Sequence, residues 1–216
     1  IGETHPETEQ VFLSRAQECG ILGAGLETTN CRIWFADQCG FMRKRRMREA
    51  PECELKGAYQ EKNMQTAYVA LQALRNCTHI QLSASHIQQG FAQVCTLTGL
   101  RGRWEILNQQ PLVICDTAHN SHGIRHVAAQ LNELSVKQLW IVFGMVADKD
   151  IDEVLRLMPT HANYIFTTPT TQRAMPAQEM AERWHAIHPQ QTPITIPQPQ
   201  EAIQYALTHA NEDDAI

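Results

Sequence analysis

Four strand-like runs, each followed by a helical pattern, fill the second half of the chain and restrict its fold more than any other feature. This alternation predicts a parallel sheet with right-handed helical crossovers. Prolines fall between the predicted elements, where a missing backbone N–H does no harm. The strand and helix pairs are expected at residues 111–116 and 123–134, 138–143 and 151–158, 163–167 and 177–186, and 194–196 and 200–210, and residues 215–216 are expected to begin a fifth strand.

The first half of the chain is less regular. The two glycines at Gly23 and Gly25 lack the third glycine and the following helix of a dinucleotide-binding fingerprint, so they are interpreted as a turn. The expected elements are a helix at 7–19, a glycine-rich turn at 20–25, strands at 32–36 and 53–55, and helices at 60–74 and 83–97.

The composition narrows the class of protein. A chain of 216 residues with 43% apolar and 19% charged side chains can bury a substantial core in one large or two small domains. A net charge of -5 argues against a nucleic-acid partner. The locally basic run at residues 43–48 has no interleaved aromatic residues, and we interpret it as a solvated loop or strand flank.

The cysteines and the apolar stretches indicate a compartment. Seven scattered cysteines, without a Cys-x-x-Cys pair or metal-ligand spacing, fit a reducing cytoplasm better than a disulfide framework. No apolar run approaches the roughly 20 residues that cross a bilayer, and the first residues lack the features of a signal peptide. We therefore expect a cytoplasmic protein that is neither exported nor embedded in a membrane.

Two polar segments follow predicted strands, at the edge where ligands bind in open parallel sheets. The first is residues 116–120, Asp-Thr-Ala-His-Asn, between the apolar run 112–115 and a helical pattern, with Arg103 nearby in sequence. An acid, an imidazole and a cation at a strand end suit a ribose and a phosphate. The second is the segment Asp-Lys-Asp at residues 148–150, which follows Gly144. Its last residue, Asp150, is expected to be the N-cap of the next helix.

Four motifs together resemble the bacterial folylpolyglutamate synthase/dihydrofolate synthase family of the Mur ligase superfamily. They are Gly-Ala-Tyr-Gln-Glu-Lys-Asn at 57–63, Gly-Arg-Trp-Glu at 102–105, Asp-Thr-Ala-His-Asn at 116–120 and Gly-Met-Val-Ala-Asp-Lys-Asp at 144–150, and the similarity runs from residue 1 to 176. The resemblance implies an α/β fold in which residues 1–97 are the rear part of a central ATP-binding ligase domain. Residues 98–216 would form a Rossmann-like, mostly parallel carboxyl-terminal ligase domain.

The same resemblance implies an ATP-dependent ligase that adds L-glutamate to dihydropteroate or to folyl-polyglutamate through an acyl phosphate. ATP, Mg²⁺, L-glutamate and dihydropteroate or folate would be its small-molecule partners, and a monomer is expected. The Gly-Lys-Ser phosphate loop and the metal ligands of the family are absent from this sequence. We therefore expect a carboxyl-terminal part of a longer chain, inactive alone and without metal ligands of its own. A cell-wall Mur-type ligase and a non-catalytic nucleotide-binding module are the alternatives.

The resemblance also implies roles for five residues. Arg103 would bind phosphate oxygens, Asp116 the ribose hydroxyls and Asn63 the adenine. His119 would face the phosphates or the acyl intermediate, and Lys149 would contact the acyl phosphate or the incoming glutamate. Arg103, His119 and Lys149 are thus the expected catalytic residues, and Arg103, His119, Asp116 and Asn63 the expected nucleotide-binding ones.

Each of these roles has a structural alternative. The alternative for Arg103 is a structural salt bridge, and that for Asn63 is a helix-start cap. Asp116 would suit a helix N-cap, although Asn120 or Ser121 fills that position more naturally. Three further residues are expected to lie on the surface, namely His122, His126 and Arg173. Arg173 would also serve to bind the carboxylates of glutamate. The family more often has proline before the Gly-Arg pair, where this chain has Arg101.

Overall fold

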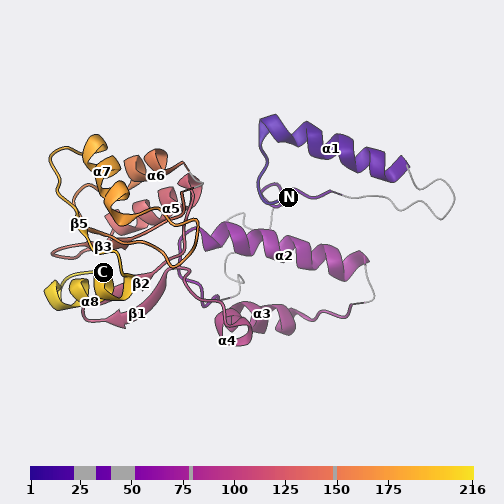
Figure 1. Cartoon of the computed structure of the whole chain (residues 1–216). Helices are drawn as coiled ribbons and strands as arrows, with labels where there is room; N and C mark the ends of the chain where they lie inside the picture. Colours follow the sequence, from indigo (N-terminus) through magenta and orange to yellow (C-terminus); the bar gives the residue numbers. More distant parts are fainter. Residues whose placement is uncertain (22–32, 40–51, 78–79, 148–149) are drawn as a thin grey trace. The chain divides into compact units, whose positions relative to one another are not determined.

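The computed structural model describes residues 1–21, 33–39, 52–77, 80–147 and 150–216 (Figure 1). The chain forms two compact units, and most of the first precedes Gly99 while most of the second follows it. A short segment that interrupts the first unit in sequence belongs to the second unit. The first unit consists of Ile1–Glu54 and Tyr59–Gly99, and the second of Leu55–Ala58 and Leu100–Ile216.

The first unit is helical in its described part. Its helices are α1 (Pro6–Ile21), α2 (Gln60–Cys77), α3 (Ala84–Ala92) and α4 (Val94–Thr98). The helices predicted at 7–19 and 60–74 are therefore confirmed. Pro6 begins α1, a position where the missing N–H of proline costs nothing.

The single helix predicted at 83–97 is wrong, because the chain breaks at Gln93 into α3 and α4. Ser83 caps α3, and its hydroxyl accepts the backbone N–H of His86 at 3.1 Å. The carboxylate of Glu54 then accepts the backbone N–H of Cys95 at 2.5 Å and that of Thr96 at 3.2 Å. This acceptor at the start of α4 comes from a distant part of the chain, so local periodicity did not reveal it.

The two strands predicted in the first half are also wrong where they are described. Residues 33–35 form neither strand nor helix, and a turn begins at Ala36, whose N–H donates to the carbonyl of Ile1 at 2.8 Å. The segment 53–55 carries Glu54, whose N–H bonds to Phe91 of α3 instead of to a neighbouring strand. Most of the predicted glycine-rich turn and the basic run at 43–48 lie outside the described residues.

The second unit contains the predicted sheet. Its parallel strands are β3 (Trp140–Phe143), β4 (Asn163–Phe166) and β5 (Ile194–Thr195), in the order β3-β4-β5. β2 (Leu112–Cys115) pairs antiparallel with an edge strand, β1 (Glu105–Gln109), which the sequence reasoning missed. The sheet is therefore mixed rather than wholly parallel, and the α/β class is confirmed.

Residues 215–216, which were expected to begin a fifth strand, link the two groups of strands through isolated bridges. Ala215 forms parallel bridges to both Leu112 of β2 and Leu139, beside β3. Its carbonyl accepts the N–H of Trp140 at 2.8 Å, and Ile216 donates to the carbonyl of Leu112 at 2.8 Å. The end of the described chain thus inserts between β2 and β3.

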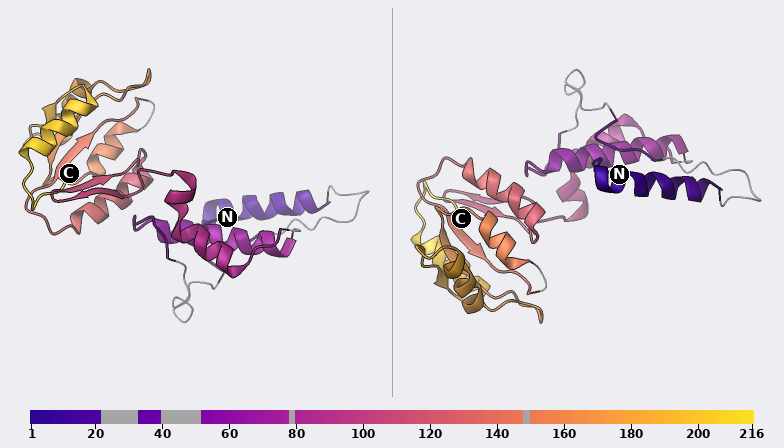
Figure 2. Two further views of the ribbon diagram at one scale, coloured as in Figure 1. Left: turned by 90° about the horizontal axis from the view of Figure 1, so that it is seen from below. Right: turned by 90° about the horizontal axis from the view of Figure 1, so that it is seen from above.

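Helices cover both faces of this sheet (Figures 1 and 2). α5 (Ser121–Asn132), α6 (Ile151–Leu157) and α7 (Ala177–Ile187) lie on one face, and α8 (Pro199–His209) lies on the other. Strand β4 alternates between the two cores: Phe166 packs with Trp184 of α7, whereas Ile165 packs with Ala202 and Ala206 of α8. All four predicted strand–helix pairs are confirmed, with ends that differ by one or two residues.

The loops after β3 and β4 are held together at the carboxyl edge of the sheet. Gly144 follows β3, and a Cβ there would lie 2.6 Å from the carbonyl oxygen of Thr167, so only glycine fits. Beyond it, Ala147 donates its N–H to the carbonyl of Arg173 at 2.8 Å. This edge is the one at which the sequence placed both polar segments.

Candidate functional site

The carboxylate of Asp116 joins two segments of the second unit. Asp116 follows the last residue of β2 and is half-buried. Its Oδ2 accepts the backbone N–H of Trp104 at 2.7 Å, and its Oδ1 accepts that of Ala118 at 2.8 Å. The carboxylate therefore ties the loop after β2 to the turn before β1, and it does not cap α5.

Arg103 lies in that turn and contacts the loop after β2. Its Nη1 donates to the hydroxyl of Thr117 and, at 3.1 Å, to the carbonyl oxygen of Gly102. The same carbonyl accepts the N–H of Thr117 at 3.0 Å and its hydroxyl at 3.2 Å. Among the described residues no carboxylate forms an ion pair with Arg103. The salt bridge that was the alternative role for Arg103 is therefore absent from this part of the structure.

The backbone of this turn is unusual. Gly102 has a φ of +68°, and a Cβ there would lie 2.7 Å from the Cγ2 of Thr117, which explains the glycine. Trp104 also has a positive φ, +52°, although its side chain is bulky and buried. Strained conformations of this kind persist only where surrounding contacts hold them, and the carboxylate of Asp116 supplies such a contact.

Glu105 supports the turn from its other side. Its Oε2 accepts the backbone N–H of Gly102 at 2.8 Å, and its Oε1 forms an ion pair with Arg101. Arg101 therefore has a partner at the position where the related family more often has proline. The sequence reasoning did not single out Glu105 or Thr117. Both stand inside the motifs that it quoted, but nothing local indicates that they contact the turn.

His119 and Asn120 occupy the rest of the loop. Asn120 is the N-cap of α5, since its Oδ1 accepts the N–H of Gly123 at 2.8 Å. This confirms the capping alternative for Asn120. His119 is exposed, and its Nδ1 lies 3.2 Å from the carbonyl oxygen of Thr117. When Nδ1 carries the proton it donates to that carbonyl and leaves Nε2 as the acceptor.

The amino end of α5 follows directly on this loop. A helix amino terminus attracts anions, because its first N–H groups have no partner within the helix and the helix dipole is positive there. In this structure that end lies next to Asp116, His119 and the turn that carries Arg103. The second unit thus brings together three of the five predicted residues: Arg103, Asp116 and His119.

Asn63 lies in the other compact unit, on α2. Its side-chain amide donates from Nδ2 to the Oε1 of Gln60 at 3.0 Å. Gln60 is buried, whereas Asn63 is exposed. This contact fixes the orientation of the amide within the first turn of α2 and leaves the carbonyl oxygen of Asn63 as its acceptor.

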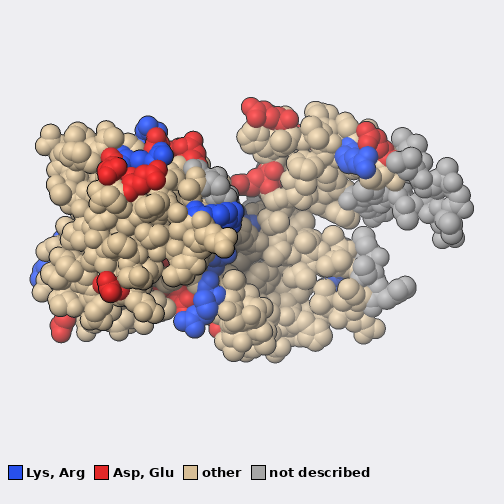
Figure 3. Space-filling model, viewed as in Figure 1, with Lys and Arg blue, Asp and Glu red and all other residues tan. Residues whose placement is uncertain are grey.

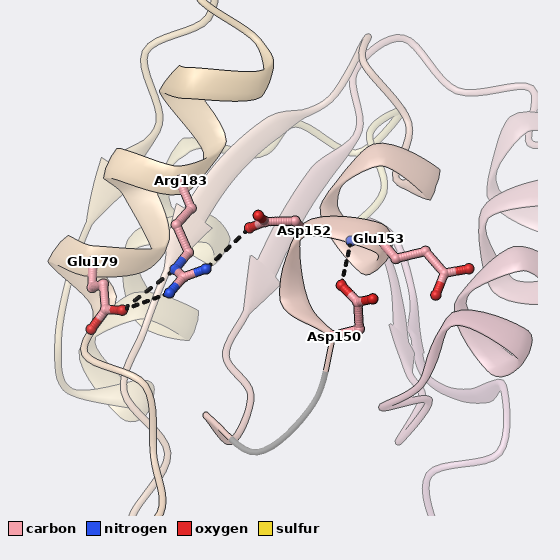
Figure 4. Close-up of polar contacts among 5 residues, drawn as sticks. All are labelled: Asp150, Asp152, Glu153, Glu179 and Arg183. Carbon is pink, nitrogen blue, oxygen red and sulfur yellow. Dashed lines mark hydrogen bonds and ion pairs between the residues drawn. The ribbon is translucent and has the colours of Figure 1, made fainter.

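The second polar segment is described only in part, because Asp148 and Lys149 lie outside the described residues. Asp150 is the N-cap of α6, as predicted, and its Oδ1 accepts the N–H of Glu153 at 3.1 Å (Figure 4). Arg173 is exposed, as predicted, and its backbone pairs with the loop that leads to this segment.

Acidic side chains outnumber basic ones on α6 and α7, which carry Asp152, Glu153, Glu179 and Glu182 beside Arg156 and Arg183. Acidic and basic side chains are mixed on the visible face of the second unit (Figure 3). In one such group, Arg183 of α7 pairs with Asp152 of α6 and with Glu179, each at 3.2 Å (Figure 4). Exposed pairs of this kind contribute little to stability and attract no particular ligand.

Cys115 is the thiol nearest to the site. Partial burial, assisted by the neighbouring Glu105 and Asp116 carboxylates, raises the pKa of this thiol. The thiol therefore stays protonated at neutral pH and is a poor nucleophile.

Within the described ranges, no group of three or more His, Cys, Asp or Glu side chains is arranged to hold a metal ion. No helix in that part of the chain is long and apolar enough to cross a bilayer.

Known proteins similar to this chain are ligases. The chain is 31% identical over 127 residues to the folylpolyglutamate synthase of Lacticaseibacillus casei, a match that covers 58% of this chain and 29% of that protein. Among solved structures, the folylpolyglutamate synthase of Mycobacterium tuberculosis complexed with ADP superposes with a TM-score of 0.62 at 25% identity. That match covers 72% of this chain and 34% of the other.

A second solved structure is a bifunctional folylpolyglutamate synthase/dihydrofolate synthase with Mn, AMPPNP and L-glutamate bound. It has a TM-score of 0.59 at 25% identity and covers 77% of this chain and 36% of its own. The chain thus spans about a third of the length of these relatives. The sequence model of one family, described as Mur ligase, glutamate ligase domain, matches residues 102–216. Because this match covers more than half of the chain, the chain belongs to the Mur ligase family.

Proposed function

We propose that this chain is part of a longer ATP-dependent ligase that joins L-glutamate to dihydropteroate or to a folyl-polyglutamate. The observation that carries the proposal is the junction of Arg103 and Asp116 at the carboxyl end of β2, where Thr117 and Trp104 connect them. A cation and a carboxylate held together at this edge suit the phosphates and the ribose of a nucleotide. Support comes from the relatives, whose structures contain ADP, or AMPPNP with Mn and L-glutamate.

The donors and acceptors of the site fit a nucleotide. The guanidinium of Arg103 keeps its Nε and Nη2 hydrogens for phosphate oxygens, since its described contacts involve Nη1 alone. The carboxylate of Asp116, which already accepts two backbone N–H groups, is an acceptor only and so matches ribose hydroxyls as donors. The amino end of α5 adds a favourable potential for anions. We assign the adenine to Asn63 of α2.

The reaction has two steps. A carboxylate oxygen of the substrate attacks the γ-phosphorus of ATP, the bond to ADP breaks, and an acyl phosphate forms. The amine nitrogen of L-glutamate then attacks the acyl carbon, phosphate leaves, the nitrogen loses a proton and an amide remains. Arg103 would neutralise the charge that develops on the transferred phosphoryl group. His119, as the imidazolium with a proton on each ring nitrogen, would donate a hydrogen bond from Nε2 to the same group. Lys149 would contact the acyl phosphate or the incoming glutamate.

A divalent metal is expected to accompany ATP, and we propose Mg²⁺. The described residues hold no cluster of three suitable side chains, so none of them is assigned as a metal ligand and no step depends on one. We also propose a cytoplasmic monomer. The five cysteines for which the structure gives a state are not joined in disulfide bonds, which suits a reducing compartment; they are Cys19, Cys39, Cys53, Cys95 and Cys115.

Replacing Arg103 tests the proposal. In the full-length ligase, Arg103→Ala should lower kcat by roughly 10²–10³-fold with a smaller effect on the KM for the folate substrate, because a preorganised donor to the developing charge is lost. Steady-state kinetics with ATP, L-glutamate and dihydropteroate measure both constants. Arg156→Ala, an exposed arginine on α6, is the matched control and should leave them unchanged. A near-normal kcat for Arg103→Ala would remove the proposed role, and a wild-type ligase without turnover would favour the non-catalytic module.

A further inference from the structure

We infer that Thr117 is a positioning residue, whose hydroxyl determines which edge of the Arg103 guanidinium faces the phosphates. This inference rests on the proposed nucleotide-binding function and goes beyond it, because it assigns a role to a side chain that does not touch the ligand. Its basis is the hydrogen bond from Nη1 of Arg103 to the Oγ1 of Thr117.

The contacts of Arg103 are confined to one corner of its guanidinium. Nη1 carries two hydrogens, and both have acceptors, namely the hydroxyl of Thr117 and the carbonyl oxygen of Gly102. Within the described part of the chain, no acceptor engages Nε or Nη2. These two nitrogens form the edge that binds a pair of oxygens bidentately, which is the geometry of a phosphate group.

The backbone on either side of this contact is fixed. The carboxylate of Asp116 binds the N–H of Trp104, which follows Arg103, and the N–H of Ala118, which follows Thr117. The N–H of Thr117 is bound as well, to the carbonyl oxygen of Gly102. The two segments are therefore held in register by their backbones, and the hydroxyl of Thr117 is left to orient the side chain of Arg103.

The orientation has an energetic consequence. An arginine side chain loses considerable rotamer freedom when it binds an anion, and a prior contact lowers that loss. Without the hydroxyl, Arg103 would keep its charge but would have to order its fork when the nucleotide binds. We therefore expect the loss to fall on the part of the affinity that depends on the phosphates, and not on the part that depends on the nucleoside.

Calorimetric titration of the full-length ligase with ADP and with adenosine tests this. Thr117→Val replaces the hydroxyl by a methyl group of similar size, and Thr117→Ser keeps the hydroxyl. We expect Thr117→Val to weaken ADP binding about tenfold, in line with the loss of one hydrogen bond to a charged group, and to leave adenosine binding unchanged. Thr117→Ser should bind ADP nearly as the wild type does. Thr208→Val removes an exposed hydroxyl from α8 that bonds to Gln204, and serves as the matched control.

Coupling to Arg103 decides the inference. In an Arg103→Ala background, Thr117→Val should cause no further loss of ADP affinity, because the group that it positions is gone. An unchanged ADP affinity for Thr117→Val, or an equal loss with and without Arg103, would overturn the positioning role while the proposed function stands. A weakening of adenosine and ADP alike would overturn it too, as a general structural effect. A wild-type ligase that binds no ADP would overturn the proposed function and this inference together.

Discussion

Asp116 shows how one side chain serves a structural and a chemical purpose. Its carboxylate accepts backbone N–H groups from two segments and holds Trp104 at a positive φ. The sequence suggested either a contact to the ribose or a helix N-cap for this residue. The structure adds that the carboxylate holds the turn that carries Arg103, so the two predicted residues do not act independently.

This dual role changes what a substitution should do. In the full-length ligase, Asp116→Ala should raise the KM for ATP about tenfold, through lost hydrogen bonds to a charged group, and should also lower kcat because Arg103 is less well held. His119→Ala should lower kcat with little change in the KM for ATP, because His119 has no part in holding the turn. Steady-state kinetics of both variants, with ATP and L-glutamate varied in turn, check this. A change in ATP KM for His119→Ala alone would mean that the two roles are reversed.

At the level of elements, the helices α5 and α6 each begin at a side-chain acceptor. Asn120 starts α5 and Asp150 starts α6, and both lie directly after a strand and its loop. Such caps are readable from sequence, because the capping residue is adjacent to the helix. α4 differs, since its amino end is bound by Glu54, which is 41 residues away from Cys95.

The contacts of Glu54 predict a pH dependence. Hydrogen bonds from the hydroxyl and N–H of Thr96 and from the N–H of Cys95 lower the pKa of this carboxyl in the folded protein. A lowered folded-state pKa means that the contribution to stability is fully present above the ordinary glutamate pKa and is lost as the pH falls through the folded-state value. In thermal unfolding measured between pH 7 and pH 3, the melting temperature should therefore fall more steeply for the wild type than for Glu54→Gln. Parallel curves for the two proteins would contradict this account.

At the level of the second unit, the last residues decide whether the sheet is continuous. Asp214 precedes the inserted residues 215–216 and is buried, with 2% of its surface exposed. Its carboxylate accepts the N–H of Gln138 at 3.1 Å and that of Asn211 at 2.7 Å. It thereby fixes the segment that joins β2 to β3, on which the position of the site relative to the rest of the sheet depends.

Two neighbouring aspartates make a controlled test of this arrangement. Asp214→Ala should lower the free energy of unfolding of the second unit by about 2–4 kcal/mol, because buried N–H donors lose their acceptor. Asp213→Ala removes an exposed carboxylate that pairs with Lys137 and should have little effect. Urea denaturation followed by the fluorescence of the buried Trp184 measures both. An equal decrease in the free energy of unfolding for the two substitutions would show that the buried carboxylate of Asp214 does not stabilise this segment more than an exposed one does.

The sequence by itself determined the order of strands and helices in the second unit and the capping role of Asp150, and it offered Asn120 or Ser121 as the cap of α5. These features rest on local patterns: apolar runs, periodicity of 3.6 and polar residues directly before a helix. It also placed Arg103, Asp116 and His119 in one region, because each lies next to an apolar run in a recognisable motif. The break between α3 and α4 and the absence of strands at 33–36 and 53–55 could not be read in this way.

Only the tertiary structure decided how these pieces meet. The insertion of 215–216 beside β2 and β3 and the contact of Arg103 with Thr117 join residues that are distant in sequence. Such contacts depend on which backbone groups and side chains the folded chain brings within hydrogen-bonding distance. A local pattern specifies an element and its ends, but which partner satisfies a backbone N–H or a guanidinium is settled by the whole fold.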